Sequence, residues 1–318
     1  MSEKIRVGMI GLGNMGGAIA EHLAAGGLVD LHVHDRSADA ARRMGDRGAT
    51  VHGSARQLAD AASVVITCLP TLAASRSAIF DAEGMVAGVA ARYWIEMSTI
   101  GPDAMKSIVA ELGARQWGVS GDASGGVMDA PVSGGAVAAR NGTLAVMVSA
   151  SAPVREALDP VLSAISSRVI DISTVPGDAQ TMKLINNLLA AANMANSFEA
   201  LALAVKLGLA PEKVVEVVNA GSGRNTGMDD RKTSAILSRK FEGLGKIGLL
   251  EKDIALAFQV ATQSGVELAD LPALSGMAQL WQQAAAQHMS GEDVSALIKV
   301  VERAMGLEVR GRGGPSAS

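Results

Sequence analysis

A glycine-rich loop near the start of the chain constrains the fold more than any other feature. Residues 6–10 form a short β-rich run, residues 17–25 have a helical pattern, and the loop joins the two. A second β-rich run, residues 31–35, ends in an aspartate at the distance that a dinucleotide-binding βαβ unit requires. The loop consists of Gly11, Leu12, Gly13, Asn14, Met15 and Gly16. The sequence therefore predicts an α/β fold with an N-terminal Rossmann-type doubly wound sheet.

Each glycine of the loop has a separate physical task. Gly11 permits a tight turn, Gly13 lets a pyrophosphate approach the backbone, and Gly16 lets the helix pack on the strand. The phosphates would then lie at a helix N-terminus, where unpaired N–H groups and the helix dipole favour anions. Asp35 would accept hydrogen bonds from the adenosine ribose and repel a 2′-phosphate, which favours NAD as the cofactor. Arg36, also a candidate cofactor contact, can pair with a 2′-phosphate or stack on adenine, so NADP stays possible.

Two further apolar runs, residues 64–69 and 93–97, are each followed by turn residues. The loops at the carboxyl ends of parallel strands line the ligand crevice of this fold. Leu69, Pro70 and Thr99 are therefore candidate cofactor contacts. Ordinary turn chemistry explains the same residues equally well on spacing alone.

A second glycine-rich segment, residues 129–135, offers a site for an anion. Ser133 is followed by Gly134 and Gly135, so a hydroxyl group and exposed backbone N–H groups come together. Such a set can hold the carboxylate of a small substrate. A flexible loop is the plain alternative.

A long helix is predicted from Gln180 to Leu207, because this run lacks Gly and Pro and is rich in Ala, Leu and Met. Lys183 and Asn187 are four positions apart and share one face, and Asn186 lies close by. A buried ammonium group is costly unless it is paired or functional. The alternative is that Lys183 extends to water and that the asparagines bond locally.

The pattern of the sequence changes after residue 175, where β-rich runs give way to helical patterns. We expect a dinucleotide-binding domain over residues 1–175 and an all-helical domain over residues 176–308, linked by the long helix. Residues 309–318 are rich in Gly, Arg and Ser, and we expect them to form a disordered tail.

Charge and composition exclude several classes of function. The net charge is −4, and no basic stripe interleaved with aromatic residues occurs, which argues against nucleic acid or a membrane surface as a partner. The single cysteine, Cys68, lies in an apolar run, and the five histidines lack metal-ligand spacing, so no metal site is expected. The first residues show no signal-peptide pattern, and the protein is expected to be cytoplasmic.

Four blocks of the sequence resemble those of the β-hydroxyacid dehydrogenases, the 3-hydroxyisobutyrate dehydrogenase family, and they occur in the same order. Together they extend over nearly the whole chain. The blocks are the loop from Gly11 to Gly16, the segment from Asp129 to Gly135 continued by Gly142-Thr143-Leu144, Gly177 with Lys183, Asn186 and Asn187, and Lys252-Asp253.

The resemblance implies hydride transfer between a nicotinamide and a small 3-hydroxy acid or its semialdehyde. Lys183 would be the general acid/base at the hydroxyl oxygen, and Asn187 would help to hold the substrate. Ser133, with Gly134 and Gly135, would bind the carboxylate, and Lys252 would contact the cofactor. A lysine desolvated between the domains and near another cation would have its pKa lowered toward neutrality, as this role requires.

The sequence departs from the family pattern in the substrate region. Gly245, followed by Lys246, stands where an aromatic residue is common, which indicates a roomier or more polar pocket. Arg224 belongs to a loop that approaches the cleft in the family. Whether Lys246 and Arg224 reach the substrate stays open, as do the identity of the acid and the physiological direction.

Two other functions are compatible with such a scaffold. One is an NADPH-dependent aldehyde or imine reductase, but imine reductases usually replace the lysine that this chain keeps as Lys183. The other is a dinucleotide-binding protein without catalysis, and such relatives tend to lose the same lysine.

The apolar helical half predicts a homodimer or homotetramer.

Overall fold

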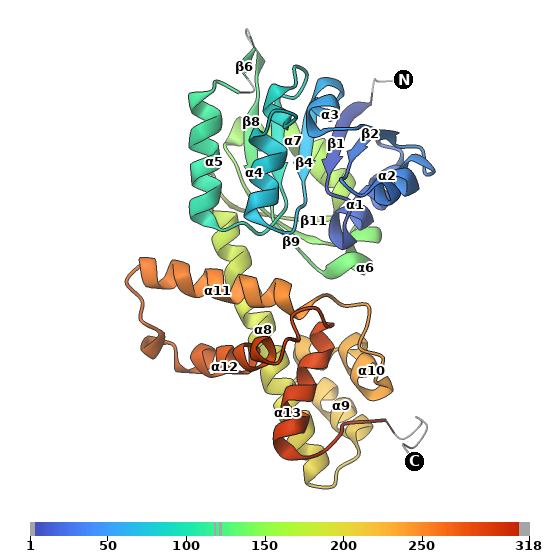
Figure 1. Ribbon diagram of the computed structural model, residues 1–318, viewed down its shortest axis with the longest axis vertical. Helices are drawn as coiled ribbons and strands as arrows, with labels where there is room; N and C mark the ends of the chain where they lie inside the picture. Colours follow the sequence, from blue (N-terminus) through green and yellow to red (C-terminus); the bar gives the residue numbers. More distant parts are fainter. Residues whose placement is uncertain (1–3, 118, 121–122, 312–318) are drawn as a thin grey trace. The chain divides into compact units, whose positions relative to one another are not determined.

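The computed structural model describes residues 4–117, 119–120 and 123–311. The chain divides into two compact units, residues 1–183 and 184–318 (Figure 1). The first unit combines a sheet with helices, and the second consists of helices, which confirms the predicted fold class. The unit boundary lies eight residues after the domain boundary that we placed at residue 175.

Nine described strands of the first unit form one mixed sheet in the order β11-β10-β8-β5-β4-β1-β2-β3, with β9 paired to β10. The six strands from β8 to β3 run parallel, whereas β10 runs antiparallel to β8. Two further strands, β6 and β7, form a separate antiparallel pair. The strands are β1 Ile5–Ile10, β2 Val29–His34, β3 Thr50–Val51, β4 Val64–Thr67, β5 Tyr93–Glu96, β6 Val119–Ser120, β7 Ala123–Ser124, β8 Gly126–Asp129, β9 Val132–Ser133, β10 Ala145–Ser149 and β11 Arg168–Ser173.

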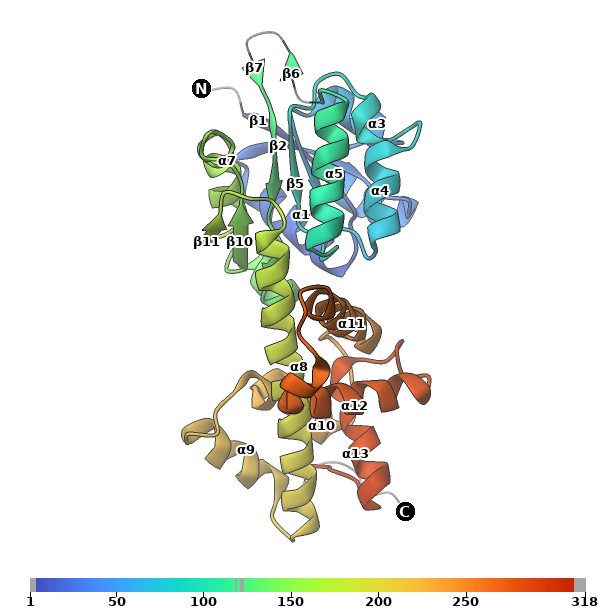
Figure 2. The same ribbon diagram turned by 90° about the vertical axis from the view of Figure 1, so that its left-hand side faces the viewer.

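Helices cover both faces of this sheet, because its central strands are apolar on both sides. Val64 and Ile66 of β4 pack into one hydrophobic cluster, and Val65 between them packs into another. Figure 2 shows α3, α4 and α5 on one side of the sheet and α7 on the other. The helices of this unit are α1 Asn14–Gly26, α2 Ala38–Gly45, α3 Ala55–Ala61, α4 Leu72–Phe80, η1 Met85–Ala87, α5 Pro102–Ala114, α6 Gly135–Arg140 and α7 Ala152–Ile165.

Helix α8, Asp178–Lys206, begins in the first unit and runs on as the central element of the second. By length and composition it could cross a membrane, a test that the core helix of a soluble protein also passes. Its residues Phe198, Leu201 and Ala202 are fully buried in the core of the second unit. The other helices are α9 Pro211–Ala220, η2 Thr226–Met228, α10 Asp230–Ser238, α11 Ile247–Gln263, η3 Leu268–Asp270, α12 Pro272–Ala286, η4 Val294–Leu297 and α13 Ile298–Met305.

The structure corrects the expectation of a disordered tail that starts at Val309. The side chain of Val309 is fully buried in the core of the second unit. Its N–H donates to Oε1 of Glu302 (2.8 Å), and its carbonyl accepts from Nη1 of Arg239 (3.2 Å). Arg239 in turn forms a bidentate ion pair with Glu302. Composition alone could not reveal that Val309 is ordered, because a single buried valine and a single ion pair hold the segment. Residues 312–318 lie outside the described part of the chain.

Replacing Val309 by Ala should lower the free energy of unfolding by roughly 2–3 kcal/mol, because two buried methyl groups are lost and a cavity remains. The matched control is Val217→Ala on α9, where the side chain is 68% exposed and little change is expected. Urea unfolding of each full-length variant, followed by circular dichroism, measures the two free energies of unfolding. Equal stabilities of the two variants would contradict the packing of Val309.

Candidate functional site

The glycine loop between β1 and α1 has the steric features that its sequence predicts. Gly11 has a φ of +96°, and a Cβ there would lie 2.5 Å from the carbonyl oxygen of Cys68. A Cβ on Gly16 would lie 2.0 Å from the carbonyl oxygen of Gly11. Gly13 differs, because a Cβ there would meet nothing within 4 Å. The loop is therefore closely packed beneath and open at Gly13, where a ligand group can approach the backbone.

The first turn of α1 is suited to an anion. Gly13 is the N-cap of the helix and has no side chain to offer to the N–H groups of this turn. Asn14 is exposed and Met15 half-buried, and the first turn contains no acidic residue. Unpaired N–H groups at a helix N-terminus, reinforced by the helix dipole, bind phosphate.

Asp35, at the end of β2, is bonded to the loop itself. Its Oδ2 accepts the N–H of Leu12 (2.6 Å), and its Oδ1 accepts the N–H of Ser37 (2.7 Å). The N–H of Gly11 donates to the carbonyl of His34 (3.0 Å). Each carboxylate oxygen keeps a lone pair, so Asp35 can still accept a bond from a ribose hydroxyl. The side chain therefore has a structural task that the motif alone did not reveal, and Arg36 beside it is exposed.

The structure brings Leu69 and Thr99 to the same edge of the sheet. The strands before them, β4 and β5, are paired so that Thr67 lies beside Glu96. The N–H of Leu69 donates to Oγ of Ser98 (2.8 Å), which joins the two loops. Pro70 follows on the surface. These loops follow the carboxyl ends of the strands, as the glycine loop does after β1.

The serine–glycine segment is an ordered junction between a strand and a helix. Ser133 ends β9 and pairs with Ala145 of β10. Gly134, with a φ of +133°, is the N-cap of α6, and Gly135 is the first residue of that helix. Helix α6 contacts α1, the helix that follows the glycine loop. The segment predicted for a carboxylate and the loop predicted for phosphate are therefore attached to two neighbouring helices.

Lys183 lies in the second turn of α8 and is only 8% exposed. The start of this helix is bound to the sheet by Asp129, the last residue of β8. Its Oδ2 accepts the N–H groups of Gly177 (2.8 Å) and Gln180 (3.1 Å). The ammonium group is therefore attached to a helix whose first turn is fixed to the carboxyl edge of the sheet.

Two buried carboxyl groups lie side by side at this edge, Glu96 on β5 and Asp129 on β8. Burial raises the pKa of Glu96 to about 7, against the opposing effect of hydrogen bonds from Ser98 and other donors. Burial likewise raises the pKa of Asp129 to about 6, although Gln180 and Gly177 donate to it. Burial raises the pKa of Cys68 to about 12, so its thiol stays protonated at neutral pH.

The second unit contributes a separate group of polar residues. Nδ2 of Asn187 donates to Oδ2 of Asp253 (2.7 Å), and Nζ of Lys252 lies 2.7 Å from Oδ1 of the same carboxylate. Asp253 therefore holds both the predicted substrate amide and the predicted cofactor lysine. Lys246 is exposed at the N-cap of α11, and Arg224 is exposed after α9.

Sequence reasoning did not assign roles to Glu96, Asp129, Gln180 or Asp253 as groups that organise the site. A signal existed for two of them, because Glu96 and Asp129 are acids at the ends of apolar strands. Such an acid is either solvated or specifically bonded. The partners of Asp129 lie about 50 positions later in the chain, so the sequence alone could not identify them.

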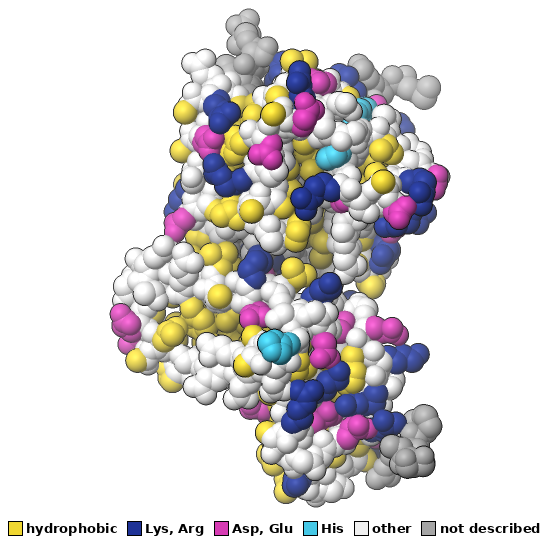
Figure 3. Space-filling view, in the orientation of Figure 1, with side chains coloured by type: hydrophobic (Ala, Val, Ile, Leu, Met, Phe, Trp, Pro, Cys, Tyr) yellow, Lys and Arg dark blue, Asp and Glu magenta, His cyan; other side chains and the backbone are white. Residues whose placement is uncertain are grey.

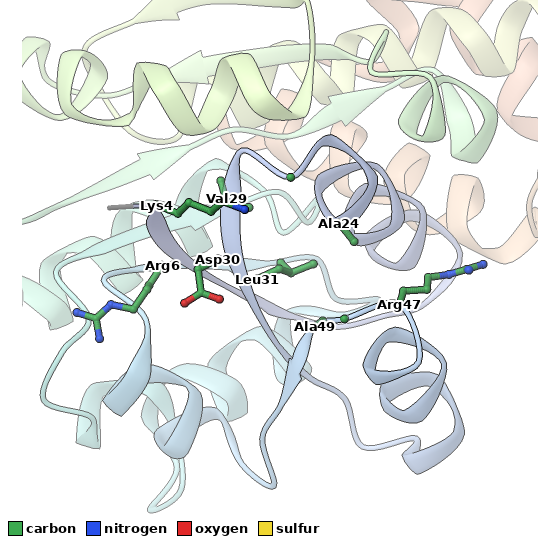
Figure 4. A pocket seen from close by; sticks show the side chains of 10 residues that line it. Lys4, Arg6, Ala24, Val29, Asp30, Leu31, Arg47 and Ala49 are labelled. Carbon is green, nitrogen blue, oxygen red and sulfur yellow. The ribbon is translucent and has the colours of Figure 1, made fainter. Parts of the chain in front are cut away.

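A cavity of about 360 Å³ at the other end of β1 does not form part of this site. Lys4, Arg6, Asp30 and Arg47 contribute to its lining. Figure 4 shows the guanidinium groups of Arg6 and Arg47 pointing away from each other, and Arg47 pairs with Glu21 (3.4 Å). The cations do not converge on a common point. Among the residues that the structure describes, no cluster of His, Cys, Asp and Glu side chains could hold a metal ion.

Comparisons with known proteins match both units. Residues 6–174 match the family model described as the NAD binding domain of 6-phosphogluconate dehydrogenase. Residues 177–301 match the model described as "NAD-binding of NADP-dependent 3-hydroxyisobutyrate dehydrogenase".

Individual relatives extend this similarity over the whole chain. The 2-(hydroxymethyl)glutarate dehydrogenase of Eubacterium barkeri is 33% identical over 316 residues, which cover 98% of this chain and 99% of the relative. The mitochondrial 3-hydroxyisobutyrate dehydrogenase of Homo sapiens is 34% identical, over 83% of this chain and 78% of the relative. A crystal structure of 3-hydroxyisobutyrate dehydrogenase from Salmonella typhimurium has a TM-score of 0.82 and 28% identity, covering 93% of this chain and 99% of that one.

Replacing Glu96 by Gln should stabilise the first unit at pH 8 and leave it nearly unchanged at pH 5. The pKa of Glu96 is raised from 4.5 to about 7 in the folded state. The stability due to the protonated group is therefore fully present below pH 4.5 and is lost as the pH rises through 7. At pH 8 the gain should be on the order of 1–3 kcal/mol.

Urea unfolding at the two pH values measures this difference. The control is Glu156→Gln on α7, where the side chain is exposed and no difference between the pH values is expected. A gain of Glu96→Gln that is the same at pH 5 and pH 8 would contradict the raised pKa.

Proposed function

The chain belongs to the β-hydroxyacid dehydrogenase family, the family of the 3-hydroxyisobutyrate dehydrogenases, and we propose how its residues divide the reaction among them. The protein is an NAD(P)-dependent oxidoreductase that acts on the CH–OH group of a small hydroxy acid. The observation that carries the residue assignment is Lys183, a buried lysine on a helix that Asp129 fixes to the ligand edge of the sheet.

The cofactor fits the first unit. The open space at Gly13 and the first turn of α1 accommodate a pyrophosphate, and Asp35 accepts the ribose hydroxyls. Further contacts come from the rest of the glycine loop and from Leu69, Pro70 and Thr99. When bound, NAD(P) supplies the acceptor or donor of the hydride. We assign a preference for NAD, because the carboxylate of Asp35 is held at the loop and disfavours a 2′-phosphate; Arg36 can stack on the adenine.

Lys183 moves the proton of the reaction. As the hydride leaves the carbinol carbon, the hydroxyl group must lose its proton, and the neutral amine of Lys183 accepts it. In the reverse direction the ammonium group returns a proton to the oxygen of the carbonyl group. A side chain exchanges a proton with the substrate most effectively when it is held within hydrogen-bond reach of the reacting oxygen.

The proposed substrate contacts are assigned residue by residue. The hydroxyl of Ser133 and the N–H groups of Gly134 and Gly135 bind the carboxylate. One hydrogen on Nδ2 of Asn187 is bound to Asp253, and its Oδ1 accepts from Nδ2 of Asn186 (3.2 Å). Asn187 bonds the substrate through the second hydrogen on Nδ2, and Lys252 contacts the cofactor. Asp253 fixes both side chains and thereby reduces the entropy lost when the substrate binds.

The substrate class follows from the residues before α11. Gly245 leaves open space where a side chain would stand, and Lys246 is an exposed cation next to it. This combination suits a 3-hydroxy acid with a further carboxylate or hydroxyl group better than the branched aliphatic 3-hydroxyisobutyrate. The relative from Eubacterium barkeri, whose name gives 2-(hydroxymethyl)glutarate as its substrate, agrees with this choice.

Self-association into a homodimer or homotetramer completes the proposal. Large hydrophobic side chains of the second unit are exposed, among them Leu189 and Leu203 of α8 and Val217 of α9. Figure 3 shows hydrophobic side chains gathered over α11 and α12 on the face that it displays. A second copy can bury such surfaces.

We place the enzyme in the cytoplasm.

Replacing Lys183 by Ala should lower kcat by on the order of 10²–10⁴, because the proton acceptor is removed. The affinity for NAD should change little. Initial rates with NAD and NADP against 3-hydroxyisobutyrate, serine, glycerate, threonate and 2-(hydroxymethyl)glutarate measure the effect. Lys206→Ala, at the other end of α8, is the control and should keep the activity. An unchanged kcat in Lys183→Ala would refute the assignment, and a wild-type protein without turnover would favour a non-catalytic role.

Replacing Lys246 by Ala should raise KM for 2-(hydroxymethyl)glutarate by roughly 10-fold, since a charge-assisted bond to the second carboxylate is lost. The KM for 3-hydroxyisobutyrate, which has one carboxylate, should stay within about twofold. The exposed Lys240→Ala serves as the control for a general loss of positive charge. Parallel changes in both KM values would rule out contact between Lys246 and the second carboxylate.

A further inference from the structure

We propose that Gln180 is a positioning residue for this reaction, because its side-chain amide joins the first turn of α8, and so Lys183, to the loop that follows β5. The inference rests on the role proposed for Lys183. It concerns residues of the first unit, so each contact that carries it lies within one compact body.

The amide of Gln180 is fully buried and uses its whole hydrogen-bonding capacity. Its Nε2 donates to Oδ1 of Asp129 (2.7 Å) and to the carbonyl of Ser98 (3.1 Å). Its Oε1 accepts the N–H groups of Ile100 (2.9 Å) and Gly101 (3.1 Å). A buried amide with four bonds in different directions has one available position, so it fixes the groups around it relative to one another.

These bonds lie on both sides of Thr99. Ser98 precedes this candidate cofactor contact, and Ile100 and Gly101 follow it. Ser98 also accepts the N–H of Leu69, another candidate contact. The loops after β4 and β5 are thereby tied to α8 through a single side chain, 80 positions later in the sequence.

Lys183 follows Gln180 by three positions, so it lies about one helical turn further along α8. Asp129 completes the connection, because its other oxygen accepts the backbone N–H of Gln180 as well as that of Gly177. Backbone and side chain of Gln180 are both bound to the same carboxylate. A shift of Gln180 therefore moves the base relative to the loops assigned to the cofactor.

Neither glutamate nor methionine, the residues closest to glutamine in size, can supply this set of four bonds. Glutamate keeps the acceptor for Ile100 and Gly101, but it lacks both donors and would place a second carboxylate 2.7 Å from Asp129. Methionine has a similar length and no amide, so it leaves two backbone N–H groups, the carbonyl of Ser98 and one carboxylate oxygen without these bonds.

The test compares Gln180→Met and Gln180→Glu with Leu112→Ala, a cavity variant on α5 in the core of the same unit. In the Gln180 variants kcat should fall by about 10²-fold, as expected for a misplaced catalytic group, while KM for NAD and for the hydroxy acid stays within about threefold. Leu112→Ala should lower the melting temperature and keep kcat. Hydrogen exchange followed by mass spectrometry should be faster at residues 98–101 and 177–184 in the Gln180 variants only.

The exchange measurement separates this inference from the proposed function. If exchange rises at both segments but the wild-type protein has no turnover, the connection stands and the proposed function fails. If Lys183→Ala is inactive and either folded Gln180 variant keeps kcat within twofold, the positioning role fails alone. Equal losses of kcat in Gln180→Met and Leu112→Ala at the same melting temperature would reduce Gln180 to a structural residue and overturn the inference.

Discussion

The hydrogen bonds of Asp129 are the interaction on which the arrangement of the first unit depends. A carboxylate at the end of a buried strand is costly to desolvate, and burial raises its pKa to about 6. Two backbone N–H groups and one amide offset this cost, and the N-terminus of α8 adds a favourable dipole. The N–H groups at the start of α8 need an acceptor, and the buried carboxylate of Asp129 needs donors. Each therefore satisfies the other.

At the carboxyl edge of the sheet, loops without regular secondary structure are held in defined positions. Strands β4, β5 and β8 end in register, so the loops after them begin at one level. Ser98 holds the loop after β4 and Gln180 holds the loop after β5, in each case through a bond to the backbone. Asp35 holds the glycine loop after β1 in the same way. Hydrogen bonds that hold a binding loop in place reduce the ordering that ligand binding would otherwise require.

The sequence could predict the features that depend on local spacing. The steric demands on Gly11 and Gly16 follow from the motif, and the structure has both. The long helix follows from a run without Gly or Pro, and the structure places it at Asp178–Lys206. In these cases neighbouring residues decide the conformation.

Features that depend on distant partners could not be predicted. Asn187 and Asp253 are 66 positions apart. The partners of Gln180 are 51 positions away at Asp129 and 80 positions away at Ile100. The ordered segment at Val309 is a similar case, because its glycine- and arginine-rich surroundings do not reveal the ion pair of Arg239 and Glu302 that binds it. Sequence periodicity carries no information about a single hydrogen bond between distant residues. The polar residues could therefore be recognised from the sequence, but their partners could not.

Helix α8 carries both the proposed base, Lys183, and the proposed substrate contact, Asn187. Lys183 and Asn187 are separated by four residues, so the helix sets a rise of about 6 Å between their backbones. One carboxylate, Asp129, holds the helix through Gln180, and another, Asp253, holds the amide of Asn187. Proton transfer needs a fixed distance between the base and the substrate hydroxyl, whereas the rest of the substrate can vary among hydroxy acids. The hydrogen bonds of Gln180 and Asn187 restrain this helix, as the first need requires. The proposed choice of substrate rests instead on Lys246, which lies outside the helix.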